Sequence, residues 1–264
     1  MKKQKYEIKI SDAAVLSVRE TQGGYFKMKL SAPDIAALAK PGQFVSLQVN
    51  ERGMPLLRRP MGVLSAKNGF IEILFKTAGK GTELLSRKTA GESISVLGPL
   101  GNGFTVNERL KHAVLIAGGY GVSPIAFLHE KLKSLRIKTT VIIGAKNKKL
   151  VFKEGFNLPE ITTEDGSLGF KGLVTGRLEK TCSGLSCGTS AVFACGPVPM
   201  LKAVAQVSEK HGIECQVSME SMMACGVGVC LSCVCAVKEG IDTGYKRICA
   251  DGPVFDSREI VWRT

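Results

Sequence analysis

Short runs of alternating apolar and polar residues fill the first hundred positions, with glycine and proline between them. Alternation with a period of two is typical of strands that have one buried face. Pro41-Gly42 and Gly98-Pro99 mark turns, and a short helix is expected at Thr82–Ser86. The expected strands are Tyr6–Ile10, Val15–Glu20, Tyr25–Leu30, Phe44–Val49, Gly69–Lys76 and Ser93–Leu97. This spacing predicts a small antiparallel β-barrel.

From residue 111 the pattern changes to apolar strands that alternate with amphipathic helices. The strand His112–Ala117 leads into a glycine-rich turn, and the helix Ser123–Leu135 follows. Further elements of this kind are the strands Thr139–Ile143 and Ala191–Cys195 and the helix Pro199–Lys210. Such alternation predicts a parallel sheet with helices on both faces.

Four cysteines stand out near the end of the sequence. Cys225, Cys230 and Cys233 are spaced Cys-x4-Cys-x2-Cys, and Cys249 follows after fifteen residues. This is the plant-type spacing for a 2Fe–2S cluster, with a shortened gap to the last ligand. Glycines between the first two cysteines let the backbone approach the sulfides and adopt positive φ. The pattern favours an iron–sulfur loop that Cys249 closes from a hairpin.

Two alternatives to this assignment remain open. A zinc site with four cysteines usually pairs two Cys-x2-Cys motifs, and this sequence has one. The thiols could also simply be buried. Cys235 is a second candidate for the fourth ligand, because alternate strand residues share a face with Cys233. No role is predicted for Cys182, Cys187 and Cys215.

Composition and charge narrow the class of protein. A length of 264 residues suggests about two domains, and nine clustered cysteines indicate a reducing compartment. The net charge of +13 is compatible with nucleic-acid binding, but the lysines are scattered and aromatic residues make up only 6%. We therefore expect a basic surface that meets anionic cofactors or an acidic partner. No signal peptide or membrane-spanning run is evident, so a cytoplasmic location is expected.

Two stretches in the barrel region combine basic residues with tight turns, and together they indicate a flavin site. The first is Arg58–Gly62, in which Arg59 offers a planar fork for a phosphate or a flavin edge. The second runs from Leu74 to Thr82 and ends in Gly81-Thr82, which opens the short helix. Backbone N–H groups at a helix N-terminus bind phosphate readily.

The turn Gly118–Pro124 is a candidate nucleotide site. It differs from Gly-x-Gly-x-x-Gly because Pro124 stands in place of the third glycine, yet its glycines would still let the backbone reach a pyrophosphate. A plain strand-to-helix turn is the alternative. Cys195 ends a predicted strand, where such sheets bind ligands, although a lone cysteine is more often a small buried hydrophobe.

The order of these parts resembles the ferredoxin–NADP reductase superfamily. Within it, the chain most resembles the electron-transfer subunits of type B dihydroorotate dehydrogenase. The stretches that carry the resemblance are RRPMG at 58–62, LFKTAGKGT at 74–82, GPLGNGF at 98–104, AGGYGVSP at 117–124, ACGPVPM at 194–200, and MMACGVGVCLSC with CADGP near the end. The implied fold is an α+β multidomain chain with a FAD-binding antiparallel β-barrel (1–106), an NAD-binding α/β domain with a parallel sheet (107–215) and a small 2Fe–2S domain (216–264).

The resemblance also implies which residues bind each cofactor. For FAD they are Arg59, Pro60, Met61, Gly62, Leu74, Phe75, Lys76, Gly81 and Thr82. For the nicotinamide cofactor they are Gly118, Gly119, Gly121, Pro124, Cys195, Gly196 and Pro197. For the cluster they are Cys225, Cys230, Cys233 and Cys249. Gly62 departs from the family, which usually has Ser or Thr there with its hydroxyl close to flavin N5. Tyr120 replaces a small or aliphatic residue, a change expected to be harmless.

The activity implied by the resemblance is electron transfer in pyrimidine biosynthesis. Electrons would pass from the FMN of a dihydroorotate dehydrogenase catalytic subunit through the 2Fe–2S cluster and FAD to NAD⁺, in a heterotetramer of two subunits of each kind. No residue of this chain would need to act as a catalytic acid or base. The alternatives are the small subunit of an NADH-dependent ferredoxin:NADP oxidoreductase or sulfide dehydrogenase, a stand-alone ferredoxin or flavin reductase, and a non-enzymatic metal or redox sensor.

Overall fold

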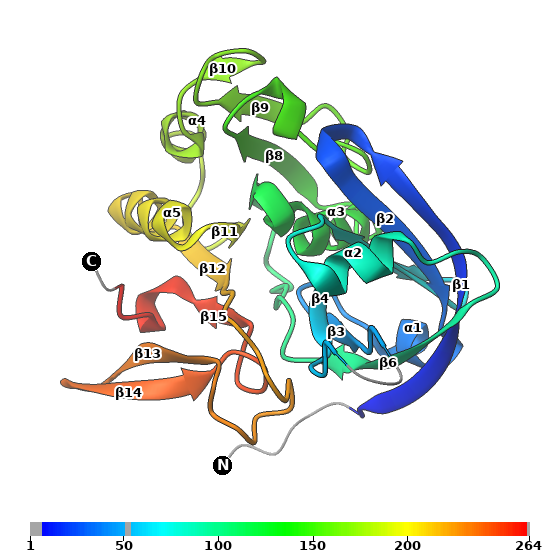
Figure 1. Cartoon of the computed structure of the whole chain (residues 1–264). Helices are drawn as coiled ribbons and strands as arrows, with labels where there is room; N and C mark the ends of the chain where they lie inside the picture. Colours follow the sequence, from blue (N-terminus) through cyan, green and yellow to red (C-terminus); the bar gives the residue numbers. More distant parts are fainter. Residues whose placement is uncertain (1–6, 51–53, 263–264) are drawn as a thin grey trace.

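A closed six-stranded barrel forms the first part of the chain in the computed structural model, which describes residues 7–50 and 54–262 (Figure 1). The strands follow the order β1-β2-β5-β4-β3-β6, and all neighbours are antiparallel. Their bounds are β1 Lys9–Thr21, β2 Tyr25–Ser31, β3 Phe44–Leu47, β4 Arg59–Lys67, β5 Phe70–Phe75 and β6 Ser93–Leu100, with helices α1 Pro33–Leu38 and α2 Lys80–Ser86. The predicted barrel is confirmed.

Three details of the barrel differ from the sequence-based expectation, and the simplest is the short helix α1, which was not predicted. The first two expected strands form one long strand, β1, which pairs with β6 through Ala14 and then with β2. Its register shifts between Val15 and Ser17, which lets one strand serve two neighbours as the barrel closes. Tyr6 lies outside the described residues. The third difference is β4, which was not expected because Pro60 lacks the N–H that a central strand normally donates.

A seven-stranded sheet forms the second part. Its order is β10-β9-β8-β7-β11-β12-β15, parallel except that β15 runs antiparallel to β12. The strands are β7 His112–Gly118, β8 Lys138–Ala145, β9 Glu160–Thr163, β10 Phe170–Lys171, β11 Ser190–Cys195, β12 Glu214–Ser218 and β15 Val254–Asp256. The helices are α3 Val122–Ser134, α4 Val174–Cys182 and α5 Val198–Lys210.

Alternate residues of the central strand β7 serve the two faces of this sheet. Leu115 packs in one buried cluster with Ile125 and Leu128 of α3. Ile116 packs in another cluster, which contains side chains of α4 and α5. Helices therefore cover both faces, as the alternating pattern predicts, and α3 lies between the sheet and the barrel (Figure 1).

The chain leaves the sheet after β12, forms the hairpin β13 Val234–Glu239 and β14 Asp242–Arg247, and returns as β15. The register pairs Val217 with Phe255, and the N–H of Met219 donates to the carbonyl of Pro253 at 2.8 Å. The segment that carries the four cysteines is thus anchored to the sheet edge at both ends. Among the described residues, no helix has the length and apolar character needed to span a bilayer.

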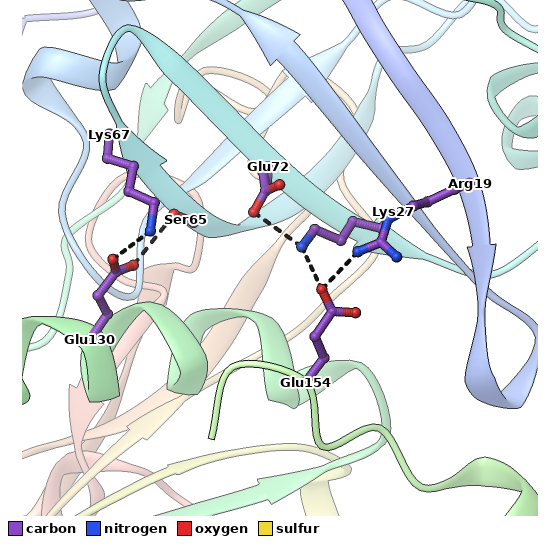
Figure 2. Close-up of polar contacts among 7 residues, drawn as sticks. All are labelled: Arg19, Lys27, Ser65, Lys67, Glu72, Glu130 and Glu154. Atoms are coloured by element: carbon purple, nitrogen blue, oxygen red, sulfur yellow. Dashed lines mark hydrogen bonds and ion pairs between the residues drawn. The ribbon is translucent and has the colours of Figure 1, made fainter. Parts of the chain in front are cut away.

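Ion pairs cross from the barrel to the second part of the chain (Figure 2). Glu154, in the segment after β8, accepts from Lys27 of β2 at 2.7 Å and from Arg19 of β1 at 2.8 Å. Glu130 of α3 pairs with Lys67 of β4 at 2.8 Å. Partial burial disfavours the charged form of Glu154, but the bonds and charges of Lys27 and Arg19 prevail and hold its pKa below the usual range.

We expect Glu154→Gln to lower the free energy of unfolding by about 1 kcal/mol at pH 7, since this carboxylate joins two cations but is half-exposed and screened by water. A carboxyl with a depressed folded pKa stabilises the fold above its unfolded pKa and loses that effect as the pH falls through the folded pKa. The difference between variant and parent should therefore shrink in urea titrations from pH 7 to pH 3. Glu83→Gln, which removes an exposed pair with Arg87, is the control and should cost about 0.3 kcal/mol. Equal losses in both variants would contradict the bridging role.

Candidate functional site

A cavity of about 310 Å³, here called the barrel cavity, lies between the barrel and the seven-stranded sheet. Strands β4 and β5 and the start of α2 form one wall, and the start of α3 with the ends of β11 and β12 forms the other. The residues predicted from the sequence that line it are Pro60, Met61, Gly62, Leu74, Phe75, Lys76, Thr82, Pro124 and Cys195. Segments from both halves of the chain thus meet at one site.

Arg59 and Gly81 lie together at the first turn of α2. A Cβ atom on Gly81 would stand 2.4 Å from Nε of Arg59, so only glycine lets the guanidinium approach this turn. The hydroxyl of Thr82 accepts the N–H of Ala78 at 2.8 Å and so fixes the loop before the helix. Arg58, in contrast, donates to the Ser95 carbonyl at 2.9 Å and belongs to the barrel itself.

The opposite wall depends on a close approach of two turns. A Cβ atom on Gly121 would stand 2.1 Å from the carbonyl oxygen of Cys195, and one on Gly196 would stand 2.5 Å from Cε of Met200. These two glycines do not line the barrel cavity. Their contribution is to let the two turns come into contact. Cys195 is buried, and burial raises the pKa of its thiol above the usual range.

A second cavity of about 480 Å³, here called the sheet cavity, opens at the carboxyl ends of β7, β8 and β9. Among the predicted residues, Gly118, Gly119 and Pro197 line it. Thr162 also lines it, and its Oγ1 is buried without a hydrogen-bond partner in the described part of the chain. A buried polar atom in that state calls for a polar ligand or water.

Tyr120 and Lys76 line both cavities. The Tyr120 ring contacts the edge of Tyr25 at a centroid distance of 5.8 Å, and Nζ of Lys76 lies 4.1 Å from the Tyr25 ring centroid. Burial raises the pKa of Tyr25 to about 12 and lowers that of Lys76. Tyr120 stands where the family has a small or aliphatic residue, a change that was expected to be harmless. Its side chain lies at the site, between the two cavities.

The four predicted cysteines gather around one loop in two pairs. The N–H of Cys249 lies 3.4 Å from Sγ of Cys233, whereas Cys225 interacts with the N–H and thiol of Cys230. Burial disfavours the Cys225 thiolate, but N–H groups of the loop outweigh this and lower its pKa to about 6. Burial and the Cys233 thiol raise the pKa of Cys249 to about 12. Within residues 7–50 and 54–262, no three His, Cys, Asp or Glu side chains form a group suited to a single metal ion.

Arg247 holds the cysteine loop against the turn that contains Cys249. Its guanidinium donates to the carbonyl of Gly228 at 3.0 Å and to the carboxylate of Asp251 at 2.8 and 2.9 Å. Gly226 and Gly228 have φ of +70° and +82°, the left-handed conformation that the sequence predicts for glycines here. No sequence pattern pointed to Arg247, because its partners lie on two separate turns.

Both flanks of the cysteine segment reach the barrel cavity. Met223 precedes Cys225 by two residues, Pro253 follows Cys249 by four, and both line the cavity wall. A Cβ atom on Gly226 would lie 3.6 Å from a methyl group of Leu100 in the barrel. The cysteine segment is therefore next to the cavity, with one residue between Met223 and Cys225 and three between Cys249 and Pro253.

Comparison with known proteins gives a consistent picture. Residues 220–261 match the iron–sulfur cluster binding domain of dihydroorotate dehydrogenase B. Over its length the chain is similar to dihydroorotate dehydrogenase B (NAD(+)) electron transfer subunits. That of Desulforamulus reducens is 38% identical over 96% of this chain and 99% of its own, and that of Geobacillus thermodenitrificans is 39% identical over 94% and 96%.

Solved structures agree on the fold. A structure reported for flavin-based electron bifurcation by an NADH-dependent reduced ferredoxin–NADP oxidoreductase superposes with a TM-score of 0.84 and 29% identity, covering 96% of this chain and 90% of that one. A ferredoxin–NADP⁺ reductase from Neisseria gonorrhoeae superposes with a TM-score of 0.65 over 78% of this chain and 93% of its own. At 19% identity, the latter establishes the reductase fold alone.

We expect Gly121→Ala to destabilise the chain by about 1–3 kcal/mol, because the added methyl overlaps the Cys195 carbonyl and the two turns have to separate. Thermal unfolding measures the loss. Gly184→Ala is the matched control, since its Cβ would meet only the Thr181 carbonyl oxygen at 3.9 Å and its φ is not left-handed. If both variants melted together with the parent, the close contact of the two turns would be wrong.

Proposed function

The chain belongs to the family of dihydroorotate dehydrogenase B electron-transfer subunits, and from this premise we propose that it transfers electrons from the FMN of a catalytic subunit to NAD⁺. The observation that carries the proposal is that both flanks of the cysteine segment, Met223 and Pro253, line the barrel cavity. A 2Fe–2S cluster exchanges single electrons and NAD⁺ accepts a hydride, so a flavin between them serves both. In this proposal the chain holds the 2Fe–2S cluster, FAD and NAD⁺ next to one another.

FAD is assigned to the barrel cavity. The wall is largely apolar, with Met61, Leu74 and Phe75, which suits an isoalloxazine ring. Arg59 against the first turn of α2 provides positive charge for a pyrophosphate, and Gly81 leaves room for the Arg59 guanidinium at this turn. These contacts support FAD and the predicted binding residues.

The nicotinamide cofactor is assigned to the sheet cavity. Its place at the carboxyl ends of parallel strands is the usual one for a dinucleotide. The unpartnered Thr162 hydroxyl offers a hydrogen bond to a sugar or base, and Gly118 and Gly119 allow a close approach of phosphate. NAD is proposed over NADP by analogy with the NAD(+)-linked relatives.

The cluster is assigned to the two cysteine pairs, Cys225 with Cys230 and Cys233 with Cys249, whose thiolates would hold it. The paired arrangement suits a centre of two irons. Cys235 lies in β13, and burial raises the pKa of its thiol to about 11. Cys249, whose thiol interacts with the Cys233 thiol, is the better fourth ligand.

We expect Cys249→Ser to lose or alter the cluster, whereas Cys235→Ser should keep about two irons and two sulfides per chain. Serine oxygen is a poor replacement for a thiolate ligand of iron. Iron and sulfide analysis with EPR after reduction gives the measurement. The opposite result would make Cys235 the fourth ligand, and stoichiometric zinc without iron would refute the cluster.

The catalytic partner is assigned to the face around the cysteine loop. Met222, Val229 and Leu231 are exposed there by 89%, 79% and 61%, and these apolar residues suit a protein interface. Val227 of the same loop is partly buried against the core and serves packing. A heterotetramer with two copies of each subunit is proposed by resemblance, and nucleic acid and membrane are not expected partners.

All nine cysteines are free, in keeping with the reducing cytoplasm proposed as the location. The small subunit of an NADH-dependent ferredoxin–NADP oxidoreductase is the alternative function, favoured by the superposition over nearly the whole chain. The lower sequence identity, 29% against 38%, makes it the second choice.

A reconstitution experiment tests the division of labour. We expect the isolated chain to oxidise NADH with an artificial acceptor but not to oxidise dihydroorotate, and an FMN-containing catalytic subunit should restore dihydroorotate:NAD⁺ activity. Val229→Glu should lower the partner-dependent rate about tenfold or more and leave NADH oxidation by the isolated chain intact, because a charge at the centre of an apolar contact is costly.

Ile241→Glu, at the fully exposed tip of the β13–β14 hairpin, is the matched control and should leave both rates unchanged. A parallel fall of both activities in Val229→Glu would mean that this side chain protects the cluster. Oxidation of dihydroorotate by the isolated chain would refute the two-subunit function.

A further inference from the structure

Ser123 carries a buried hydroxyl that nothing in the described chain satisfies. It is the second residue of α3, its exposed fraction is 3%, and its Oγ has no hydrogen-bond partner. Ser123 also lines the barrel cavity. Burying a hydroxyl without a partner is unfavourable, and such groups are rare in native structures. The orphan atom therefore indicates a polar ligand in the cavity.

Gly62 of β4 lies beside Ser123 where the barrel wall and the start of α3 meet at the edge of the cavity. A Cβ atom built on Gly62 would lie 3.7 Å from Cβ of Ser123 and 3.4 Å from Cδ of Pro124. Because Gly62 has no side chain, the barrel wall presents only backbone at this point, and the hydroxyl comes from the helix on the opposite side. The nearby Thr82 hydroxyl is engaged with Ala78 and Gly79.

We propose that Ser123 is a direct hydrogen-bonding partner of the flavin ring in this chain. The inference rests on the proposed function, which assigns FAD to the barrel cavity. The edge of an isoalloxazine ring carries both acceptors and a donor, and a serine hydroxyl can serve either. Its position in the first turn of α3, where the helix dipole is positive, favours electron density on the group it contacts. Ser123 thereby stabilises the reduced ring as well as binding it.

Ser123→Ala tests the assignment in the full-length chain. We expect FAD affinity to fall roughly three- to tenfold, the loss for one hydrogen bond, and the flavin midpoint potential to become more negative. The flavin absorption band should also shift. Without FAD the variant should melt at the parental temperature or slightly above it, because the substitution removes an unpaired buried group and alanine favours a helix.

Two further variants make the result specific. Ser208→Ala deletes a buried hydroxyl that donates to the Val204 carbonyl at 2.8 Å in α5, so it should lower the melting temperature and leave the FAD affinity and potential unchanged. Gly62→Ser in the Ser123→Ala background returns a hydroxyl from the barrel wall, where the space admits a Cβ atom. It should recover part of the affinity and potential.

The outcomes distinguish a failure of the proposed FAD site from a failure of the role assigned to Ser123. If the parent chain bound no flavin, the proposed FAD site itself would fall. If the parent bound FAD while Ser123→Ala kept its affinity, absorption spectrum and midpoint potential, the FAD site would stand and the assignment of Ser123 would be overturned. A lower melting temperature in the FAD-free variant would show that the hydroxyl has a structural partner, which also overturns it.

Discussion

The pairing of β12 with β15 is the constraint on which the arrangement of the site depends. It fixes Ser218 and Val254 side by side at the edge of the sheet, so the segment between them has to leave and return at one place. Asn102 adds a link from the barrel, because its side chain donates to the carbonyls of Ala250 and Asp251. The cysteine loop is held between sheet and barrel, next to the cavity that both enclose.

Two glycines next to the site allow close contacts that any side chain would prevent. Gly121 and Gly81 each leave out a side chain so that another group can come close, the Cys195 carbonyl in one case and the Arg59 guanidinium in the other. Neither contact provides much stability. Each instead allows two segments of the chain to approach closely beside the barrel cavity. Some buried polar atoms beside the cavities have no hydrogen-bond partner in the described residues. Three buried side-chain atoms in the described residues lack a partner, on Ser123, His129 and Thr162, and each of these residues lines a cavity.

The sequence predicted those parts of the fold and site in which the chemistry requires particular residues at a particular spacing. The Cys-x4-Cys-x2-Cys loop and the glycine-rich turn after β7 follow from local backbone needs, and the period of two or 3.6 residues separated the barrel from the alternating sheet. It was uninformative where the partner is distant. Pro60 is unusual in a strand, so β4 was not predicted. The hydrogen bonds of Arg247 join two turns that are distant in the sequence. A serine at the start of a helix, such as Ser123, is common without a ligand. The return of β15 to the sheet edge likewise requires knowledge of the tertiary fold.

The antiparallel closure by β15 also bears on how the chain is synthesised. Translation proceeds at about 5–20 residues per second, and 24 positions separate Cys225 from Cys249. The last of the other three thiols, Cys233, precedes Cys249 by 16 positions, so all three leave the ribosome roughly 1–3 s before the fourth, and β15, which anchors them, follows still later. By that time the barrel and the parallel strands have all been made. Assembly of the metal centre is in this sense a late event, because the fourth cysteine and the strand that anchors the loop are made last.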